Sequence, residues 1–198
     1  MRDFRWFVFG LIACVTQAHA QSAQIPDALR AAVQRSERIG QQLFRASSSS
    51  NESPSALVTT ARTTAEKASV DRCNVNYRTI VLDKVGNDAP TIAVYLIASP
   101  PLSAGVMGGR HFRVETNSEG TQVLSITPST RGCLLIPTNQ GLPAGATPVA
   151  VTISHILSSA PTEFHVFLSL LHSKPVYVAT EVGTWKVEGG AISLIAGR

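Results

Sequence analysis

The chain has 198 residues and a formal net charge of +4, with 44% hydrophobic side chains and only 15% charged ones. This length and apolar content predict a single domain with extensions and a real hydrophobic core. The positive charge is mild and is not clustered, so the composition does not support nucleic-acid binding.

Residues 1–20 have the three parts of a secretory signal peptide. Two arginines precede an apolar run at 6–15, and an Ala-His-Ala sequence at 18–20 matches the small-x-small cleavage pattern. The run is too short to span a bilayer, which needs about 20 apolar residues. We therefore expect export to the periplasm or the medium, with no transmembrane segment and a net charge of +3 once residues 1–20 are removed.

A second interpretation of the same segment is a lipoprotein. The Leu-Ile-Ala-Cys sequence at 11–14 resembles a bacterial lipobox, in which Cys14 is lipidated after cleavage. The exported chain would then begin at a modified Cys14 rather than at Gln21. A mass measurement of the exported protein separates these two outcomes.

Residues 21–72 are predicted to form a helical N-terminal extension. A helix is expected at 25–45, because its apolar residues recur at helical spacing. A Ser-rich linker follows at 46–54, and an Ala- and Thr-rich helix is expected at 55–69. The helices should cover the face or the edge of a sheet. The alternative is that residues 21–50 form a mobile arm or a partner-binding helix.

Residues 73–198 are predicted to form an antiparallel β domain. Runs of β-branched and aromatic residues alternate with Gly-, Pro- and Asn-rich turns, and no strand–helix–strand alternation is recognised. The fold class is therefore α+β, with N-terminal helices followed by an antiparallel sheet or β-sandwich of about 8–10 strands. The predicted strands cover residues 77–85, 91–98, 110–116, 122–127, 133–137, 148–157, 162–171, 176–180, 185–187 and 191–195.

Cys73 and Cys133 remain after removal of the signal peptide, and an even pair in an exported chain predicts a disulfide. It would close a loop of about 60 residues and stabilise the fold by about 3–4 kcal/mol in the chain-entropy model. The alternatives are two buried thiols or a redox site, although the sequence has no Cys-x-x-Cys motif.

Three residues near the C-terminus form the first candidate site. If the strands at 148–157 and 162–171 pair as a hairpin, His155 lies opposite His165, with the Cβ atoms about 5 Å apart. Glu163 shares their face, and two histidines with a carboxylate can bind a divalent metal or act as an acid and base. A register slip of one residue separates the histidines, and the simpler interpretation is a structural role.

The second candidate is the Gly-Gly-Arg-His-Phe-Arg sequence at 108–113. Its glycines would let the backbone approach an anionic group beside Arg110, His111 and Arg113. The alternative is that the glycines only mark a β-bulge or the start of a strand.

Standard catalytic and cofactor motifs are absent. The sequence contains no Gly-x-Ser-x-Gly, His-Glu-x-x-His, phosphate loop or dinucleotide fingerprint, so no cofactor is expected and an enzyme is not favoured. The predicted function is a binding or inhibitor/immunity-type module for a protein, a peptide or an envelope component. The alternative is a metal-binding protein or a hydrolase that uses His155, Glu163 and His165.

Several segments of the β domain resemble a group of uncharacterised exported proteobacterial proteins. They are the sequences at 108–114, 132–134, 161–167 and 175–178, with the Trp-x-Val ending at 185–187. The resemblance covers about residues 91–196. It implies a small bacterial envelope protein and says nothing about mechanism.

Overall fold

The computed structural model describes residues 25–49, 54–82, 91–101, 104–137, 146 and 148–197. The signal peptide at 1–20 with Cys14, the turn expected at 86–90 and most of the loop expected at 138–147 lie outside these residues. The described part contains three helices and ten strands, which confirms the α+β class. They are α1 (Asp27–Ser48), α2 (Ala56–Lys67), β1 (Tyr77–Leu82), β2 (Ile92–Ala98), β3 (Val106–Met107), β4 (Phe112–Thr116), β5 (Val123–Pro128), β6 (Leu135–Ile136), β7 (Val151–Ser154), α3 (Glu163–His172), β8 (Val176–Ala179), β9 (Gly183–Glu188) and β10 (Ala191–Gly197).

The two N-terminal helices form where the sequence predicts them. Helix α1 continues through Ser48, so the first three residues of the expected linker are helical. The Ser47 and Ser48 hydroxyls donate to the carbonyl of Phe44, which lies one turn back. Helix α2 begins after Ser55, whose hydroxyl oxygen accepts the N–H of Val58 and so caps the first turn.

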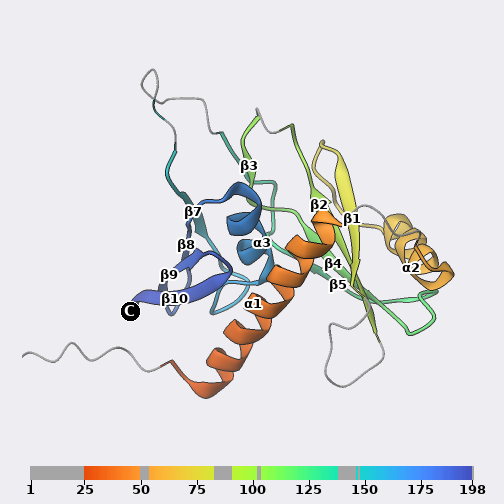
Figure 1. The fold of residues 1–198 in the computed structure, drawn as a ribbon, viewed down its shortest axis with the longest axis horizontal. Helices are drawn as coiled ribbons and strands as arrows, with labels where there is room; N and C mark the ends of the chain where they lie inside the picture. Colours follow the sequence, from red (N-terminus) through yellow and green to blue (C-terminus); the bar gives the residue numbers. More distant parts are fainter. Residues whose placement is uncertain are drawn as a thin grey trace, which may run out of the picture.

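The first sheet has the strand order β1-β2-β4-β5, and all its pairs are antiparallel. Strand β2 lies between β1 and β4 and is buried along its whole length, which explains its continuous apolar sequence. Helix α2 packs its alanines on one face, where Ala61 and Ala65 meet the buried side chains of β2 and β4. Figure 1 shows α2 on the outer side of this sheet.

The second sheet has the order β10-β9-β8-β7, and it contains a parallel pair that the sequence did not predict. Strands β7 and β8 run parallel, because α3 lies between them in the chain and carries it back across the sheet. The strand expected at 162–171 is wrong, since Glu163–His172 is a helix. The expectation that no strand–helix–strand unit exists is wrong for the same reason.

The cause of this error is the burial of α3. Seven consecutive residues, from Glu163 to Ser169, are buried, so the helix has no polar face to reveal its period. A short continuous apolar run fits a buried strand and a buried helix equally well. The helix ends at Ser173, which adopts a left-handed conformation with φ of 50°.

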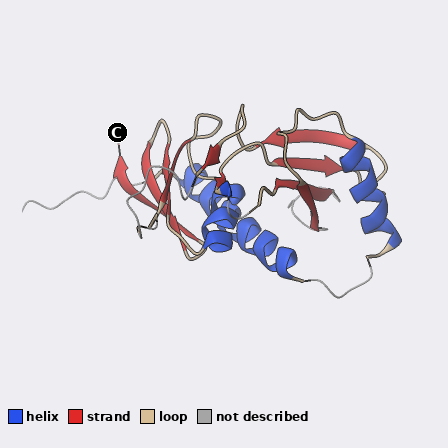
Figure 2. Cartoon of the chain, turned by 90° about the horizontal axis from the view of Figure 1, so that it is seen from above, coloured by secondary structure: helices blue, strands red, loops and turns tan. Residues whose placement is uncertain are grey.

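Helix α3 lies between the two sheets. Figure 2 shows the layers in the order second sheet, α1 with α3, first sheet and α2. One hydrophobic core joins α1 and α3 to side chains of both sheets, including Tyr95 and the fully buried Trp185. Gly40 allows α1 and α3 to approach closely, because a Cβ atom there would lie 2.5 Å from the Cβ of Val166.

Helix α1 packs against the β domain along its apolar stripe. Val33, Ile39 and Leu43 are buried in the core. Glu37 and Gln41 add polar contacts, since Glu37 accepts the N–H of Ile192 at 2.7 Å and Gln41 donates to the carbonyl of Gly190 at 3.1 Å. In the described residues, no helix has the length and hydropathy needed to cross a membrane.

The predicted disulfide is present. Cys73 and Cys133 are bonded with their Cα atoms 5.9 Å apart, and the bond spans a sequence separation of 60 residues. It ties the segment before β1 to the segment before β6.

Replacing both Cys73 and Cys133 with serine is expected to lower the free energy of unfolding by about 4 kcal/mol, because the unfolded chain regains the entropy of an open loop. Urea denaturation of the two proteins measures the change. A reducing agent should produce the same loss in the wild type and none in the double variant. A loss below about 1 kcal/mol would contradict a stabilising role for this bond.

Candidate functional site

Five of the six predicted binding residues surround the first turn of α3, although the predicted hairpin does not exist. Glu163 and His165 belong to this turn, and His111 stacks on Phe164 with 5.7 Å between ring centroids. Arg113 reaches the same turn from β4, and His155 reaches it from the end of β7. Only Arg110 lies elsewhere.

The histidine pair meets as predicted, but through a different geometry. The rings of His155 and His165 have centroids 4.8 Å apart and an interplanar angle of 80°. His155 follows a strand and His165 lies on a helix, so the two are not cross-strand neighbours. Both side chains are buried, with 2% of their surfaces exposed.

His165 serves as part of the helix cap. Its Nδ1 accepts the N–H of Thr162 at 3.0 Å, which is the bond that a Glu or Gln makes in a capping box. The neutral ring therefore carries its proton on Nε2. Burial, with smaller contributions from His155 and His111, lowers the pKa of His165 to about 3. The ring is neutral at physiological pH.

This arrangement does not support the alternative interpretation, a metal site formed by His155, Glu163 and His165. A metal-binding histidine normally donates the N–H of its other nitrogen, but Nδ1 of His165 is an acceptor. Glu163 is also turned away, because its Oε1 accepts from Nη1 of Arg113 at 2.9 Å. Among the residues that the structure describes, no group of three His, Cys, Asp or Glu side chains could hold a metal ion.

The ion pair between Arg113 and Glu163 fixes α3 to the first sheet. The side chain of Glu163 is 7% exposed and that of Arg113 is 24% exposed. Glu115 also lies near the guanidinium, with 3.4 Å between its Oε1 and Nε of Arg113. Tyr95 is buried beside this pair, and burial followed by the charge of Glu163 raises the pKa of its hydroxyl. The group is a structural polar cluster rather than a solvent-facing site.

His111 is a satisfied core residue. Its Nδ1 accepts the N–H of Ala98 at 3.1 Å, and its Nε2 donates to the carbonyl of Met107 at 3.0 Å. The side chain is fully buried, and burial lowers its pKa to about 4. Both ring nitrogens are used in joining β2, β3 and β4, so neither is available to a ligand.

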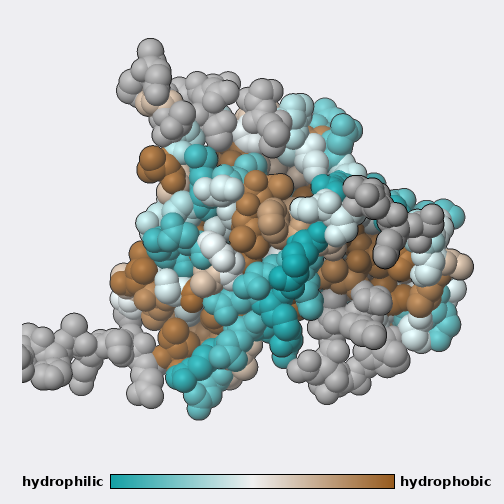
Figure 3. All heavy atoms as spheres, viewed as in Figure 1, coloured by the Kyte–Doolittle hydropathy of each residue, from teal (hydrophilic) through white to brown (hydrophobic). Residues whose placement is uncertain are grey.

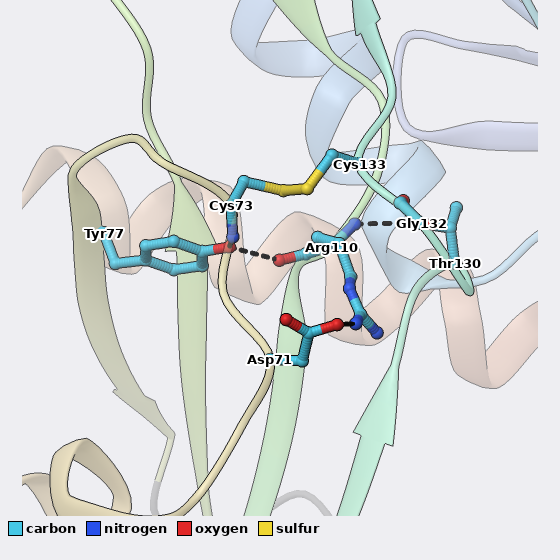
Figure 4. Close-up of polar contacts among 7 residues, drawn as sticks. All are labelled: Asp71, Cys73, Tyr77, Arg110, Thr130, Gly132 and Cys133. Atoms are coloured by element: carbon cyan, nitrogen blue, oxygen red, sulfur yellow. Dashed lines mark hydrogen bonds and ion pairs between the residues drawn. A yellow bond between two sulfur atoms is a disulfide. The ribbon is translucent and has the colours of Figure 1, made fainter.

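Arg110 stabilises the corner around the disulfide, as Figure 4 shows. Its backbone has a φ of 57°, and its guanidinium pairs with Asp71. Tyr77 donates its hydroxyl to the carbonyl of Arg110 and accepts the N–H of Cys73, both at 3.0 Å. Thr130 accepts the N–H of Arg110 at 2.9 Å. These contacts favour the strand-entry interpretation of the glycine-rich sequence.

A pocket of about 440 Å³ opens at the N-terminal end of α3. His155 lies at its base, with Nε2 2.8 Å from Oγ of Ser158, a residue that the sequence analysis did not single out. Ser158 itself donates to the carbonyl of Ala160 at 2.6 Å. Because the hydroxyl proton of Ser158 is directed to Ala160, Nε2 of His155 is the donor in the bond between His155 and Ser158. His155 therefore does not act as a base toward this serine, and the serine is not activated as a nucleophile.

A second pocket of about 300 Å³ lies toward the C-terminal end of α3, and we refer to it as the groove. Its walls come from β1, from the end of β2 with the residues after it, from β3 and from α3. The residues that line it are Arg78, Ile97, Ala98, Ser99, Pro100, Gly105, Met107, Phe167, Leu168, Leu171 and His172. The described lining is mainly apolar, and none of these residues is Asp or Glu. Leu171 is 42% exposed although it is large and hydrophobic.

The groove was missed because its residues come from separate segments that carry no motif. His172, which is half-buried at the end of α3, is one of them. The one signal in the sequence is the apolar run that forms α3, because it continues to Leu171 at an exposed position.

Comparisons with known proteins give no independent identification. No protein-family model, curated protein or solved structure matches this chain.

Proposed function

We propose that the protein is an exported binding module of the bacterial envelope, and that the groove binds the acyl chain of a single-chain amphiphile. The observation that supports this proposal most strongly is the apolar, concave surface beside the buried helix α3, where Leu171 is exposed. The secretory pattern at 1–20 and the disulfide support export.

The shape of the groove supports a ligand of limited size. A volume of about 300 Å³ is at the lower end of the range for small-molecule sites, which favours one chain over two. Phe167 and Leu168 are buried members of the core, so the floor of the groove is held in place by packing. A preformed apolar surface binds an acyl chain mainly by removing hydrocarbon from water.

The same observations give less support to the alternative functions. A metal-binding protein would need ligands that His165 and Glu163 do not provide, because both are engaged in structural bonds. A protein partner of the inhibitor or immunity type could insert one apolar side chain into the groove. The groove alone, with eleven described lining residues, is smaller than a typical protein interface of about 20–30 residues a side, so we favour the acyl ligand.

Replacing Leu171 with aspartate is expected to weaken binding of a fluorescent fatty acid, 11-(dansylamino)undecanoic acid, by at least about tenfold. The new carboxylate would be desolvated against the acyl chain, and it would repel the probe's own carboxylate. Fluorescence titration measures the dissociation constants.

Leu124→Asp is the matched control, because Leu124 is 53% exposed on β5 and does not line the groove. This variant should bind the probe as the wild type does. Equal weakening by both variants, or no binding to the wild type, would refute the assignment of the groove.

A further inference from the structure

We propose that the groove selects an anionic head group, and that Arg78 at its rim is the residue that recognises it. This inference rests on the proposed function and adds the charge class of the ligand and its orientation. The ligand would be a single-chain fatty acid. Its acyl chain would lie against Met107 and Leu171, and its carboxylate would face Arg78.

The position of Arg78 is fixed by the sheet. Arg78 pairs with Ile97 in the β1–β2 register, so the two side chains share one face of the first sheet. Ile97 is buried and forms part of the groove wall, whereas Arg78 is exposed at its edge. A ligand whose chain covers Ile97 therefore brings its head group next to the guanidinium.

The guanidinium is anchored but retains donor capacity. Arg78 donates to the carbonyl of Ser47 near the end of α1, which holds the side chain beside the groove. An arginine has five N–H donors in a planar fork that matches a carboxylate. Among the residues that the structure describes, no Asp or Glu forms an ion pair with Arg78.

The other described residues that line the groove also carry no negative charge. Among the described residues that line the groove, His172 is the other titratable side chain, and none is Asp or Glu. Lys174 lies close enough to His172 to contribute, after burial, to lowering its pKa. A cation bound here would meet the positive charge of Arg78, whereas an anion would meet a charge of opposite sign.

The surface supports this orientation. Figure 3 shows hydrophobic atoms exposed beside the C-terminal half of α1, in the area where Figure 1 draws α3 and β3. The hydrophilic surface of α1 borders this patch. An amphiphile placed here would bury its chain over α3 and keep its head group at the end of α1, where Arg78 is held.

The test compares three ligands with the same chain and different charges: dodecanoate, dodecanol and dodecyltrimethylammonium. Each is titrated into the purified protein by calorimetry below the concentration at which it forms micelles. We expect dodecanoate to bind at least about tenfold more tightly than dodecanol, and the ammonium compound to bind most weakly.

Arg78→Gln should remove the preference for dodecanoate and leave the affinity for dodecanol unchanged. Arg35→Gln is the matched control, because Arg35 is exposed on α1 three turns before Ser47 and should not affect any of the three ligands. Two results would overturn this inference and leave the proposed function intact. They are equal affinities of the wild type for dodecanoate and dodecanol, and an unchanged preference for dodecanoate in Arg78→Gln.

If none of the three ligands binds, or if binding survives Leu171→Asp, the proposed function fails together with the inference. A further arm uses vesicles of phosphatidylglycerol, whose head group is also anionic. We expect the protein not to float with them, because the groove holds one chain. Flotation that Arg78→Gln abolishes would assign the arginine to a membrane surface and overturn the fatty-acid assignment.

Discussion

Acidification from pH 7 to pH 4 is expected to lower the free energy of unfolding by about 6 kcal/mol through two buried histidines, His111 and His165. Burial lowers the pKa of His111 to about 4, and burial with two neighbouring histidines lowers that of His165 to about 3. Each contributes about 3 kcal/mol over this range. Small proteins are stable by only about 5–15 kcal/mol, so the fold should be lost near the acid end.

The sign follows from proton binding. In the unfolded chain both histidines have a pKa of about 6.5, so they take up protons as the pH falls below that value. In the folded protein they stay neutral until the pH approaches 4 for His111 and 3 for His165. The unfolded state therefore binds more protons between pH 6.5 and 4, and stability falls throughout that range.

His165→Gln isolates one of the two contributions. Glutamine is a natural residue at this position of a capping box, so it can accept the N–H of Thr162 without titrating. We expect the variant to lose about 3 kcal/mol less than the wild type between pH 7 and pH 4. Urea denaturation at a series of pH values measures the difference.

His172→Gln is the control, because His172 is half-buried at the other end of α3 and lies outside the histidine cluster. Because burial also lowers the pKa of His172, the pH dependence of this variant should be somewhat weaker than that of the wild type but stronger than that of His165→Gln. A wild-type free energy of unfolding that is constant from pH 7 to pH 4.5 would contradict the account of the buried histidines.

Arg113→Met is expected to destabilise the protein by about 3 kcal/mol, because it leaves the carboxylate of Glu163 buried without its partner. The expected value is at the lower end of the range for buried pairs, since the side chain of Arg113 is 24% exposed. Methionine keeps the length of the side chain, which limits the loss from packing. Chemical denaturation at neutral pH measures the effect.

The double variant Arg113→Met/Glu163→Gln supplies the decisive comparison. It removes the charge that the first change leaves unpaired, so it should be more stable than Arg113→Met alone. Arg131→Met, at an exposed position outside the cluster, is the control and should change stability by less than about 0.5 kcal/mol. Additive losses from the two single changes would show that Arg113 and Glu163 are not coupled.

The sequence predicts correctly those helices and strands that have one exposed and one buried face, because their apolar residues then recur at a regular spacing. Helix α1 has a clear apolar stripe through Val33, Ile39 and Leu43, and it forms as predicted. The hairpin of β9 and β10 forms around Gly189 and Gly190, which have φ values of 59° and 90°. These features depend on residues that are close in the sequence.

The sequence does not distinguish a helix from a strand where an element is buried on all sides, because its hydrophobic periodicity is then lost. Helix α3 is buried between two sheets and carries no polar stripe, so it was interpreted as a strand. His155 and His165 nevertheless meet, because the chain that leaves β7 must pass the start of α3. Their partners could not be deduced, since Arg113 of β4 and Glu163 of α3 are 50 residues apart.

The groove could not be predicted from the sequence for the same reason. Its walls come from four elements whose arrangement depends on the position of α3, so an error in α3 concealed it. Single exposed apolar residues such as Leu171 are common and predict nothing by themselves. They gain meaning only when the fold places them beside Met107 and Arg78.

A methyl-detected NMR titration with dodecanoate tests the proposed function most directly. We expect the largest shift changes at the methyl groups of Ile97, Met107, Leu168 and Leu171, which line the groove. The methyls of Ile156 and Leu157, in the pocket at the other end of α3, should not move. Shift changes centred on that second pocket or on the exposed strand β5, or no saturable changes at all, would contradict the assignment of the groove as the binding site.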